Sequence, residues 1–381
     1  MNVVIAIDSF KGSLTSWDAG TAAGEGLKKA IPDAMVRVFP VADGGEGTVE
    51  ALVRGLSGRK RCITALDPLG RPIDCEYGIL DETGTAIIEM SAAAGIFLLA
   101  DEERDPLHTT TYGVGQMILD ALENGCRHFV IGIGGSATND GGAGMLQALG
   151  FALLDKNGTP IPRGAIGLKE LKSIDVSGAD PRLSACTFRV ACDVKNPLCG
   201  PQGCSAIFGP QKGATPSTVE QMDKWLESYA QLASLVSDNA DKDAEGAGAA
   251  GGIGFAFNTF LNSELVSGIE LILSEIRIEE AIQNADLVIT GEGRLDAQTV
   301  MGKAPFGIAT LAQKYKKPVV AFSGCVTPEA TVCNAAGIDA YFPILRTVTT
   351  LSEALETEYA RANMVATAEQ VFRLYALAKS V

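Results

Sequence analysis

Charged side chains gather in short glycine-containing segments that follow apolar, strand-like runs of the chain. Asp8 and Lys11 follow the run VVIAI, and Asp43 and Glu46 follow a second run, AMVRVFPV. In open parallel sheets, ligands bind beyond the carboxyl ends of the strands. A lysine there can bind a phosphate as a mobile point charge, and paired carboxylates can hold a metal ion or its water. Helix capping and solvation would explain the same residues without a ligand, so both interpretations stay open here.

A third charged segment, GEGRLDAQTVMGK, follows the apolar run ADLVIT. It places Glu292, Arg294 and Asp296 close to the end of a buried strand. Carboxylates beside a guanidinium suit an anionic substrate that is handled together with a metal ion. A purely structural network of ion pairs is the alternative interpretation.

Two further segments add a candidate base and a candidate cation. The sequence RVACDVKNPL places Asp193 and Asn196 at the end of an apolar run, and FGPQKGA carries Lys212 between turn residues. A carboxylate at a strand end is suited to accept a proton from a substrate hydroxyl. We therefore expect Asp193 to be a general base.

The segment VIGIGGSATNDGGAGM, residues 130–145, is rich in glycine and contains no lysine or arginine. Gly132, Gly134 and Ala137 satisfy the G-x-G-x-x-A form of the dinucleotide-binding fingerprint. The match is weak, because SATNDGG adds polar and glycine residues where the fingerprint requires a helix to have begun. The remaining interpretation is a loop of backbone donors, with the Ser136 hydroxyl and the Asn139 amide, suited to an oxygen-rich ligand.

The elements that must position these residues alternate between strand and helix at both ends of the chain. This alternation predicts a parallel sheet covered by helices. In the middle, RKRCITALDPLGRPIDCEYGILDETGTAIIEM predicts three antiparallel strands and hence a second sheet. We expect an α/β protein with a discontinuous Rossmann-like domain, 1–60 plus 285–381, and a second α/β domain inserted at 61–284. A helix of about 351–378 should close the chain.

Composition excludes several classes of protein. The formal net charge of -15 argues against nucleic-acid binding, because such a surface repels the phosphate backbone. Nine cysteines without a C-x-x-C pair and only two histidines argue against zinc sites and Ser-His nucleophiles. With no signal-like start and no membrane-length apolar run, we expect a cytoplasmic protein without a membrane partner. A homo-oligomer is compatible with the sequence.

Seven motifs, in this order along the chain, resemble the bacterial type I glycerate kinase family: DSFKGSL, PVADGGEGTVEA, IGIGGSATNDGGAG, ACDVKNPL, FGPQKGA, GAGAAGGIG and DLVITGEGRLDAQTVMGKAP. The resemblance implies ATP-dependent phosphorylation of D-glycerate with Mg2+, most often on the 2-hydroxyl, in organic-acid breakdown. It also implies two α/β domains with the active site in the cleft between them. By position, the family's charged motif residues fall on Asp8, Lys11, Asp43, Glu46, Asp193, Lys212, Glu292, Arg294 and Asp296.

Phosphoryl transfer depends mainly on positioning and on neutralising charge, and this guides the roles that we expect. Phosphate oxygens would contact Lys11, Lys212, Ser136 and Asn139. The Mg2+ shell would use Asp43, Glu292 and Asp296. Glycerate would contact Arg294, whose fork matches a carboxylate, and Asn196. Asp193 would accept the hydroxyl proton, with Asp8 and Lys11 as further catalytic residues.

Two other functions remain compatible with the motifs taken singly. The weak fingerprint would suit an NAD-dependent oxidoreductase acting on a hydroxy acid. A two-domain architecture would also suit a non-catalytic sensor of a small acid.

Overall fold

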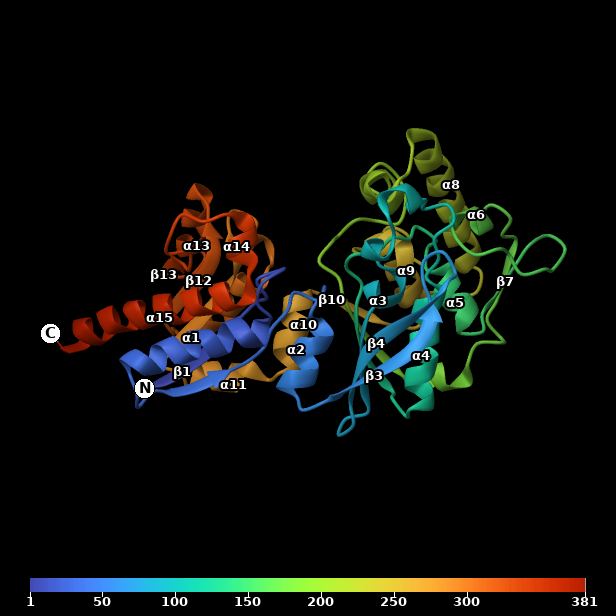
Figure 1. The fold of residues 1–381 in the computed structure, drawn as a ribbon. Helices are drawn as coiled ribbons and strands as arrows, with labels where there is room; N and C mark the ends of the chain where they lie inside the picture. Colours follow the sequence, from blue (N-terminus) through green and yellow to red (C-terminus); the bar gives the residue numbers. More distant parts are fainter. Residues whose placement is uncertain (381) are drawn as a thin grey trace. The chain divides into compact units, whose positions relative to one another are not determined.

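The computed structural model describes residues 1–380, and the chain divides into two compact units. Unit 1 comprises Met1–Asp43, Glu50–Leu56 and the chain from Ile269 onward, and unit 2 comprises Gly44–Val49 and Ser57–Gly268. Both units are α/β, as the sequence predicts (Figure 1). The first unit resumes at Ile269, earlier than the expected residue 285. The reason is packing, because Ile269 lies against Gly307 and Ile276 lies against Gly55, both within unit 1.

Unit 1 is built on a five-stranded sheet in the order β13-β12-β11-β1-β2, with every pair parallel. The strands are β1 Asn2–Ile7, β2 Met35–Val38, β11 Leu287–Leu295, β12 Val319–Val326 and β13 Ala340–Pro343. The helices are α1 Ser16–Ala30, α2 Thr48–Gly55, α10 Gly268–Glu275, α11 Ile278–Gln283, α12 Ala304–Lys314, α13 Val332–Ala335, α14 Leu351–Leu355 and α15 Thr357–Ser380, with 3-10 helices η5 Thr299–Met301 and η6 Pro328–Thr331. The first two residues of α2 and the first residue of α10 belong to unit 2.

The core of unit 1 follows from the alternation of side chains along its strands. Val3, Ile5 and Ile7 of β1 share one face of the sheet and join a single buried cluster with residues of α1 and α15. These two helices lie side by side over that face (Figure 1). The buried residues of α12 are absent from this cluster although α12 contacts β11 and β1, so α12 covers the other face.

Unit 2 is built on a six-stranded mixed sheet in the order β10-β9-β6-β5-β4-β3. As expected, the meander β3-β4-β5 is antiparallel, and β5, β6, β9 and β10 are parallel. The strands are β3 Arg59–Leu66, β4 Pro72–Leu80, β5 Thr85–Glu89, β6 His128–Gly132, β9 Thr187–Ala191 and β10 Glu264–Val266, with a separate pair β7 Ala152–Leu154 and β8 Ser173–Asp175. The helices are α3 Ser91–Ala94, α4 Tyr112–Glu123, α5 Ala143–Ala148, α6 Ala165–Leu168, α7 Cys204–Phe208, α8 Pro216–Ala233 and α9 Ala249–Phe260, with 3-10 helices η1 Ile96–Leu98, η2 Asp101–Glu103, η3 Pro181–Ala185 and η4 Pro210–Lys212.

Two local expectations were wrong. The single closing helix is two helices, because Glu356 has non-helical backbone angles (φ -59, ψ 121) and Thr350 caps a separate short helix. Glu292 and Arg294, expected in a segment that follows the strand, lie within β11, because their backbone continues to pair with Ser323 and Cys325 of β12. In residues 1–380, no helix is long and apolar enough to cross a membrane.

Candidate functional site

The carboxyl edge of the unit 1 sheet brings two buried carboxylates together. Ile7 of β1 pairs with Gly291 of β11, and the backbone N–H of Asp8 donates to the Gly291 carbonyl at 2.8 Å. The next residue on each strand is therefore an acid at the same edge, Asp8 or Glu292, and both are buried. Asp43, beyond the end of β2, is near enough to act electrostatically on Asp8. The sheet thus assembles three acids that the sequence separates widely.

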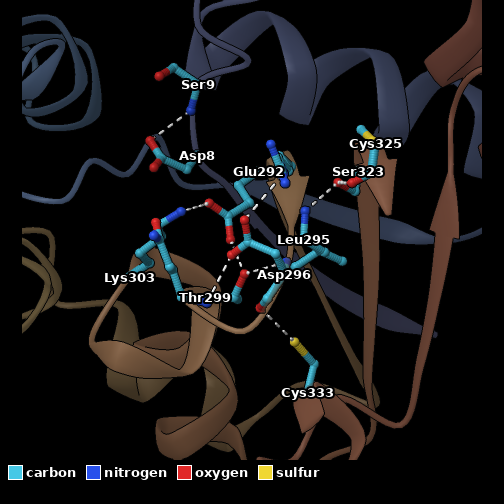
Figure 2. Close-up of polar contacts among 12 residues, drawn as sticks. Asp8, Ser9, Glu292, Leu295, Asp296, Thr299, Lys303, Ser323, Cys325 and Cys333 are labelled. Carbon is cyan, nitrogen blue, oxygen red and sulfur yellow. Dashed lines mark hydrogen bonds and ion pairs between the residues drawn. The ribbon is translucent and has the colours of Figure 1, made fainter. Parts of the chain in front are cut away.

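Glu292 is held by two side chains from the segment after β11 (Figure 2). The Thr299 hydroxyl donates to Oε1 at 2.6 Å, and the Lys303 ammonium lies 3.2 Å from Oε2. Burial raises the pKa of Glu292, and the contacts with Thr299 and Lys303 oppose that rise. Thr299 and Lys303 were not among the predicted site residues, although both lie in the motif GEGRLDAQTVMGK.

Asp8 is the carboxyl group that this environment perturbs most clearly. The backbone N–H of Ser9 donates to its Oδ1 at 2.7 Å (Figure 2). Burial, followed by the charges of Asp43 and Glu292, raises the pKa of Asp8 to about 7, against the opposing effects of Ser9 and Lys11. In the ligand-free protein near neutral pH, the Asp8 carboxyl group is therefore present in both its neutral and its charged form. A cation at this edge would favour the charged form.

Two cationic side chains project beside these acids. Lys11 is exposed on a tight turn in which the Phe10 N–H donates to the Leu14 carbonyl at 2.8 Å. The Arg294 side chain is 65% exposed, and its Nε lies 3.2 Å from Oδ2 of Asp296. Most of the guanidinium fork therefore remains available to an anion from solvent.

The candidate metal ligands do not form a ready-made cage. Within residues 1–380, no three His, Cys, Asp or Glu side chains are grouped as a metal site. Asp296, whose Oδ1 accepts from the Gln298 N–H at 2.8 Å, is instead tied to its own turn. Mg2+ commonly uses only one or two carboxylates together with substrate phosphates, so the acidic edge still fits a cation that is bound together with a nucleotide.

In unit 2, the glycine-rich segment follows β6 as the sequence predicts, but it is not a dinucleotide fingerprint. Helix α5 begins only at Ala143, after the whole polar stretch. Lys212 lies behind this segment, with its ammonium donating to Ser136 Oγ at 2.8 Å and to the Thr138 carbonyl at 2.6 Å. Asn139 is fully buried, and its amide donates to Ser205 Oγ at 2.8 Å. All of this group is buried, and Ser136, at 8% exposed, is its least buried member.

Asp140 is a structural anchor of this segment that the sequence analysis missed. Its fully buried carboxylate accepts from Thr111 N–H at 2.9 Å, from the Thr111 hydroxyl at 3.0 Å, and from the N–H groups of Gly142 and Gly144 at 3.1 and 3.2 Å. Burial raises the pKa of Asp140, and these hydrogen bonds oppose the rise. The run of three threonines at 109–111 was the available signal.

The motif GAGAAGGIG has a packing role beside the same segment. Gly251 has a φ of +71°, and a side chain there would collide with the Thr138 carbonyl. Its own carbonyl accepts from the Gly141 N–H at 2.9 Å. Glycine therefore allows two backbone segments to touch and fixes the segment from Thr138 to Gly141.

Asp193 and Asn196 both follow β9, where each has a local partner. Asp193 is exposed, and its Oδ1 accepts from the Gly268 N–H at 2.9 Å and from the Ser267 hydroxyl at 3.2 Å, at the start of α10. The Asn196 amide donates to the Gln202 carbonyl at 2.8 Å. Asp193 is thus oriented but accessible, whereas Asn196 has an evident structural role.

The chain matches known proteins along its full length. The model of the glycerate kinase family matches residues 3–376. The glycerate 2-kinase of Escherichia coli K12 is 48% identical over 359 residues, covering 94% of each chain, and the glycerate kinase of Bacillus subtilis 168 is 45% identical over 381 residues, covering 100% of this chain and 99% of its own. The crystal structure of a putative glycerate kinase 2 from Salmonella typhimurium LT2 superposes with a TM-score of 0.93 at 46% identity, covering 100% of both chains. The chain therefore belongs to the glycerate kinase family and is an enzyme of the kinase class.

Proposed function

We propose that this enzyme transfers the terminal phosphoryl group of ATP to the 2-hydroxyl of D-glycerate, giving 2-phosphoglycerate and ADP. Membership of the glycerate kinase family supports the substrate pair. The name of the Escherichia coli relative, glycerate 2-kinase, supports the 2-hydroxyl as acceptor. Such a product would enter hydroxy-acid breakdown, and the use of ATP suits an enzyme of the cytoplasm.

The observation that carries the proposal is the perturbed carboxyl group of Asp8. Burial, Asp43 and Glu292 together raise its pKa to about 7, so negative charge is concentrated at one edge of the sheet. A site that accumulates acids needs a cationic ligand to relieve their repulsion. The metal complex of a nucleotide supplies such a cation. An acid that binds without a metal ion, as in a non-catalytic sensor, would be repelled by these carboxylates.

Mg2+ is the cation that this donor set fits, because hard carboxylate oxygens are its usual protein ligands. Asp43, Glu292 and Asp296 would hold it directly or through water. When bound, it would neutralise charge on the transferring phosphoryl group. Thr299 and Lys303 keep the Glu292 carboxylate in one orientation, and the Ser9 N–H does the same for Asp8.

The exposed polar groups suit the remaining tasks of a phosphoryl transfer. Lys11 would bind phosphate oxygens as a point charge, and Arg294 would bind the glycerate carboxylate through its fork. Asp193 would accept the proton of the 2-hydroxyl, since its orientation is fixed by the Gly268 N–H while the carboxylate stays accessible. Asp8 would be a further catalytic residue, and Asn196 would contact glycerate.

The polar residues around the glycine-rich segment of unit 2 would serve the nucleotide phosphates. Ser136, the least buried member, is the residue suited to direct contact, and backbone N–H groups of the segment would add donors. Asn139 and Lys212 are buried, so we assign them to holding the segment rather than to first contact with ATP.

The direct test is ADP release by the purified enzyme, followed with a coupled assay. We expect release only when ATP, D-glycerate and Mg2+ are all present, and we expect no change of absorbance in the nicotinamide band when NAD replaces ATP. ADP release that does not depend on glycerate, or glycerate-dependent reduction of NAD, would contradict the proposal.

A further inference from the structure

Lys212 is a buried cation that holds the glycine-rich segment without a direct part in the proposed reaction. It ends the 3-10 helix η4 and is 2% exposed. Its ammonium donates to the Ser136 hydroxyl oxygen at 2.8 Å and to the Thr138 carbonyl at 2.6 Å. Within residues 1–380, no aspartate or glutamate forms an ion pair with Lys212. The side chain therefore points into the protein, toward two atoms of the glycine-rich segment.

Packing alone gives no reason for a lysine at this position. Burial lowers the pKa of Lys212 to about 8, and only the nearby Cys204 and Asp140 oppose that effect. An apolar side chain of similar length would fill the same space without the cost of desolvating an ammonium group. The lysine must therefore contribute through its two hydrogen bonds.

The first hydrogen bond determines what the Ser136 hydroxyl can do. An ammonium group is only a donor, so the Ser136 oxygen must accept from Lys212 and its own proton must point elsewhere. Among residues 1–380, the Ser136 hydroxyl donates no hydrogen bond of its own. The backbone on either side of Ser136 is fixed, because the Gly135 carbonyl accepts from Ile96 N–H at 2.8 Å and Ala137 N–H donates to the Ala94 carbonyl at 2.9 Å.

The second hydrogen bond lies beside another unsatisfied polar group. Thr138 gives its carbonyl to Lys212, yet its own buried hydroxyl has no partner among residues 1–380. Asn139 Oδ1 is likewise buried without a partner. Buried polar atoms normally have partners, so this concentration of unsatisfied atoms sets the segment apart from an ordinary packed loop.

We propose that Lys212 is a positioning residue that orients the Ser136 hydroxyl as a hydrogen-bond donor to a phosphate oxygen of the nucleotide. The inference rests on the proposed use of ATP. The Lys212 ammonium donates to a lone pair of the Ser136 oxygen and cannot accept the hydroxyl proton. The hydroxyl proton is then left for an acceptor other than Lys212, and a phosphate oxygen would be such an acceptor.

The test is a double-mutant cycle with Ser136→Ala and Lys212→Met, measured on the full-length enzyme. A hydrogen bond to a charged group accounts for about a tenfold to hundredfold change in affinity, so we expect each single variant to weaken ADP binding by about this factor. The double variant should bind no more weakly than the worse single variant, because both changes remove the same donor. The KM for glycerate should stay unchanged, and Lys169→Met, an exposed lysine of the same unit, should leave nucleotide binding unaffected.

Three results would overturn the proposal. Additive losses would mean that Lys212 contacts phosphate itself, and unchanged ADP binding in a folded Lys212→Met variant would mean that the lysine only stabilises the fold. If Lys212→Met does not fold, Ser136→Ala decides alone, and unchanged ADP affinity would refute the role of its hydroxyl. Failure of the wild-type enzyme to bind ADP or consume ATP would instead contradict the proposed function, independently of the pattern among the variants.

Discussion

Replacing Asp8 by asparagine should stabilise the ligand-free protein above neutral pH while abolishing activity. Burial, Asp43 and Glu292 raise the pKa of Asp8 from the usual 3.8 to about 7. Because the pKa is raised in the folded state, the stabilising contribution of this group is fully present below pH 4 and is lost as the pH rises through 7. A difference of about 3 pKa units, at about 1.4 kcal/mol each, gives about 4 kcal/mol of stability lost by pH 8. Asparagine is neutral throughout and keeps an oxygen acceptor for the Ser9 N–H.

The assay is urea unfolding between pH 5 and 8.5 in the presence of EDTA. Trp17 and Trp225 are the protein's two tryptophans. A Trp225→Phe background therefore leaves Trp17, in the same unit as Asp8, as the single fluorescent reporter. The gain in free energy of unfolding from Asp8→Asn should grow with pH, whereas Asp33→Asn, an exposed control in the same unit, should show no such gain. A gain that is absent at pH 8, or that does not vary with pH, would refute the reasoning about the acidic edge.

The remaining predictions concern three other charged residues. Asp193→Asn should lower kcat by about 10² to 10⁴, the usual contribution of a positioned base, with ATP affinity kept, as steady-state kinetics would show; unchanged turnover would remove Asp193 from that role. Lys11→Ala should weaken both turnover and nucleotide binding in kinetic and calorimetric measurements, and a fully active variant would exclude a phosphate contact. Because the pKa of Lys212 is lowered from 10.5 to about 8, its burial cost is complete below pH 8 and disappears above 10.5. Chemical unfolding should therefore show wild type gaining about 3 kcal/mol relative to Lys212→Met across that range, and a constant difference would contradict the burial of a charged lysine.

Much of the fold could be predicted because local patterns and long-range pairing agree in this chain. The apolar runs of β1 and β11 are short and buried, as expected for parallel strands, and the turns DPLGRP and DETG mark the antiparallel meander. The break at Glu356 could not be predicted, since no glycine or proline marks it. The division at Ile269 was also hidden, because it depends on tertiary packing against Gly307.

The candidate site was predicted in part for a similar physical reason. Acids after strands are visible in a sequence, and parallel pairing of Ile7 with Gly291 brings Asp8 and Glu292 to one edge. Burial is not visible in the same way, so the inward direction of Lys212, toward Ser136, could not be predicted from the sequence. Asp140 could have been suspected only by pairing it with the distant threonines at 109–111.

The most direct test of the central claim is phosphorus NMR of the product formed from ATP and D-glycerate. Phosphate on the 2-hydroxyl is coupled to the single proton of C2 and gives a doublet, whereas phosphate on the 3-hydroxyl is coupled to two protons of C3 and gives a triplet. We predict a doublet that coincides with authentic 2-phosphoglycerate and appears together with ADP. A triplet would contradict the assigned acceptor hydroxyl, and the absence of any new phosphomonoester would contradict the proposed reaction itself.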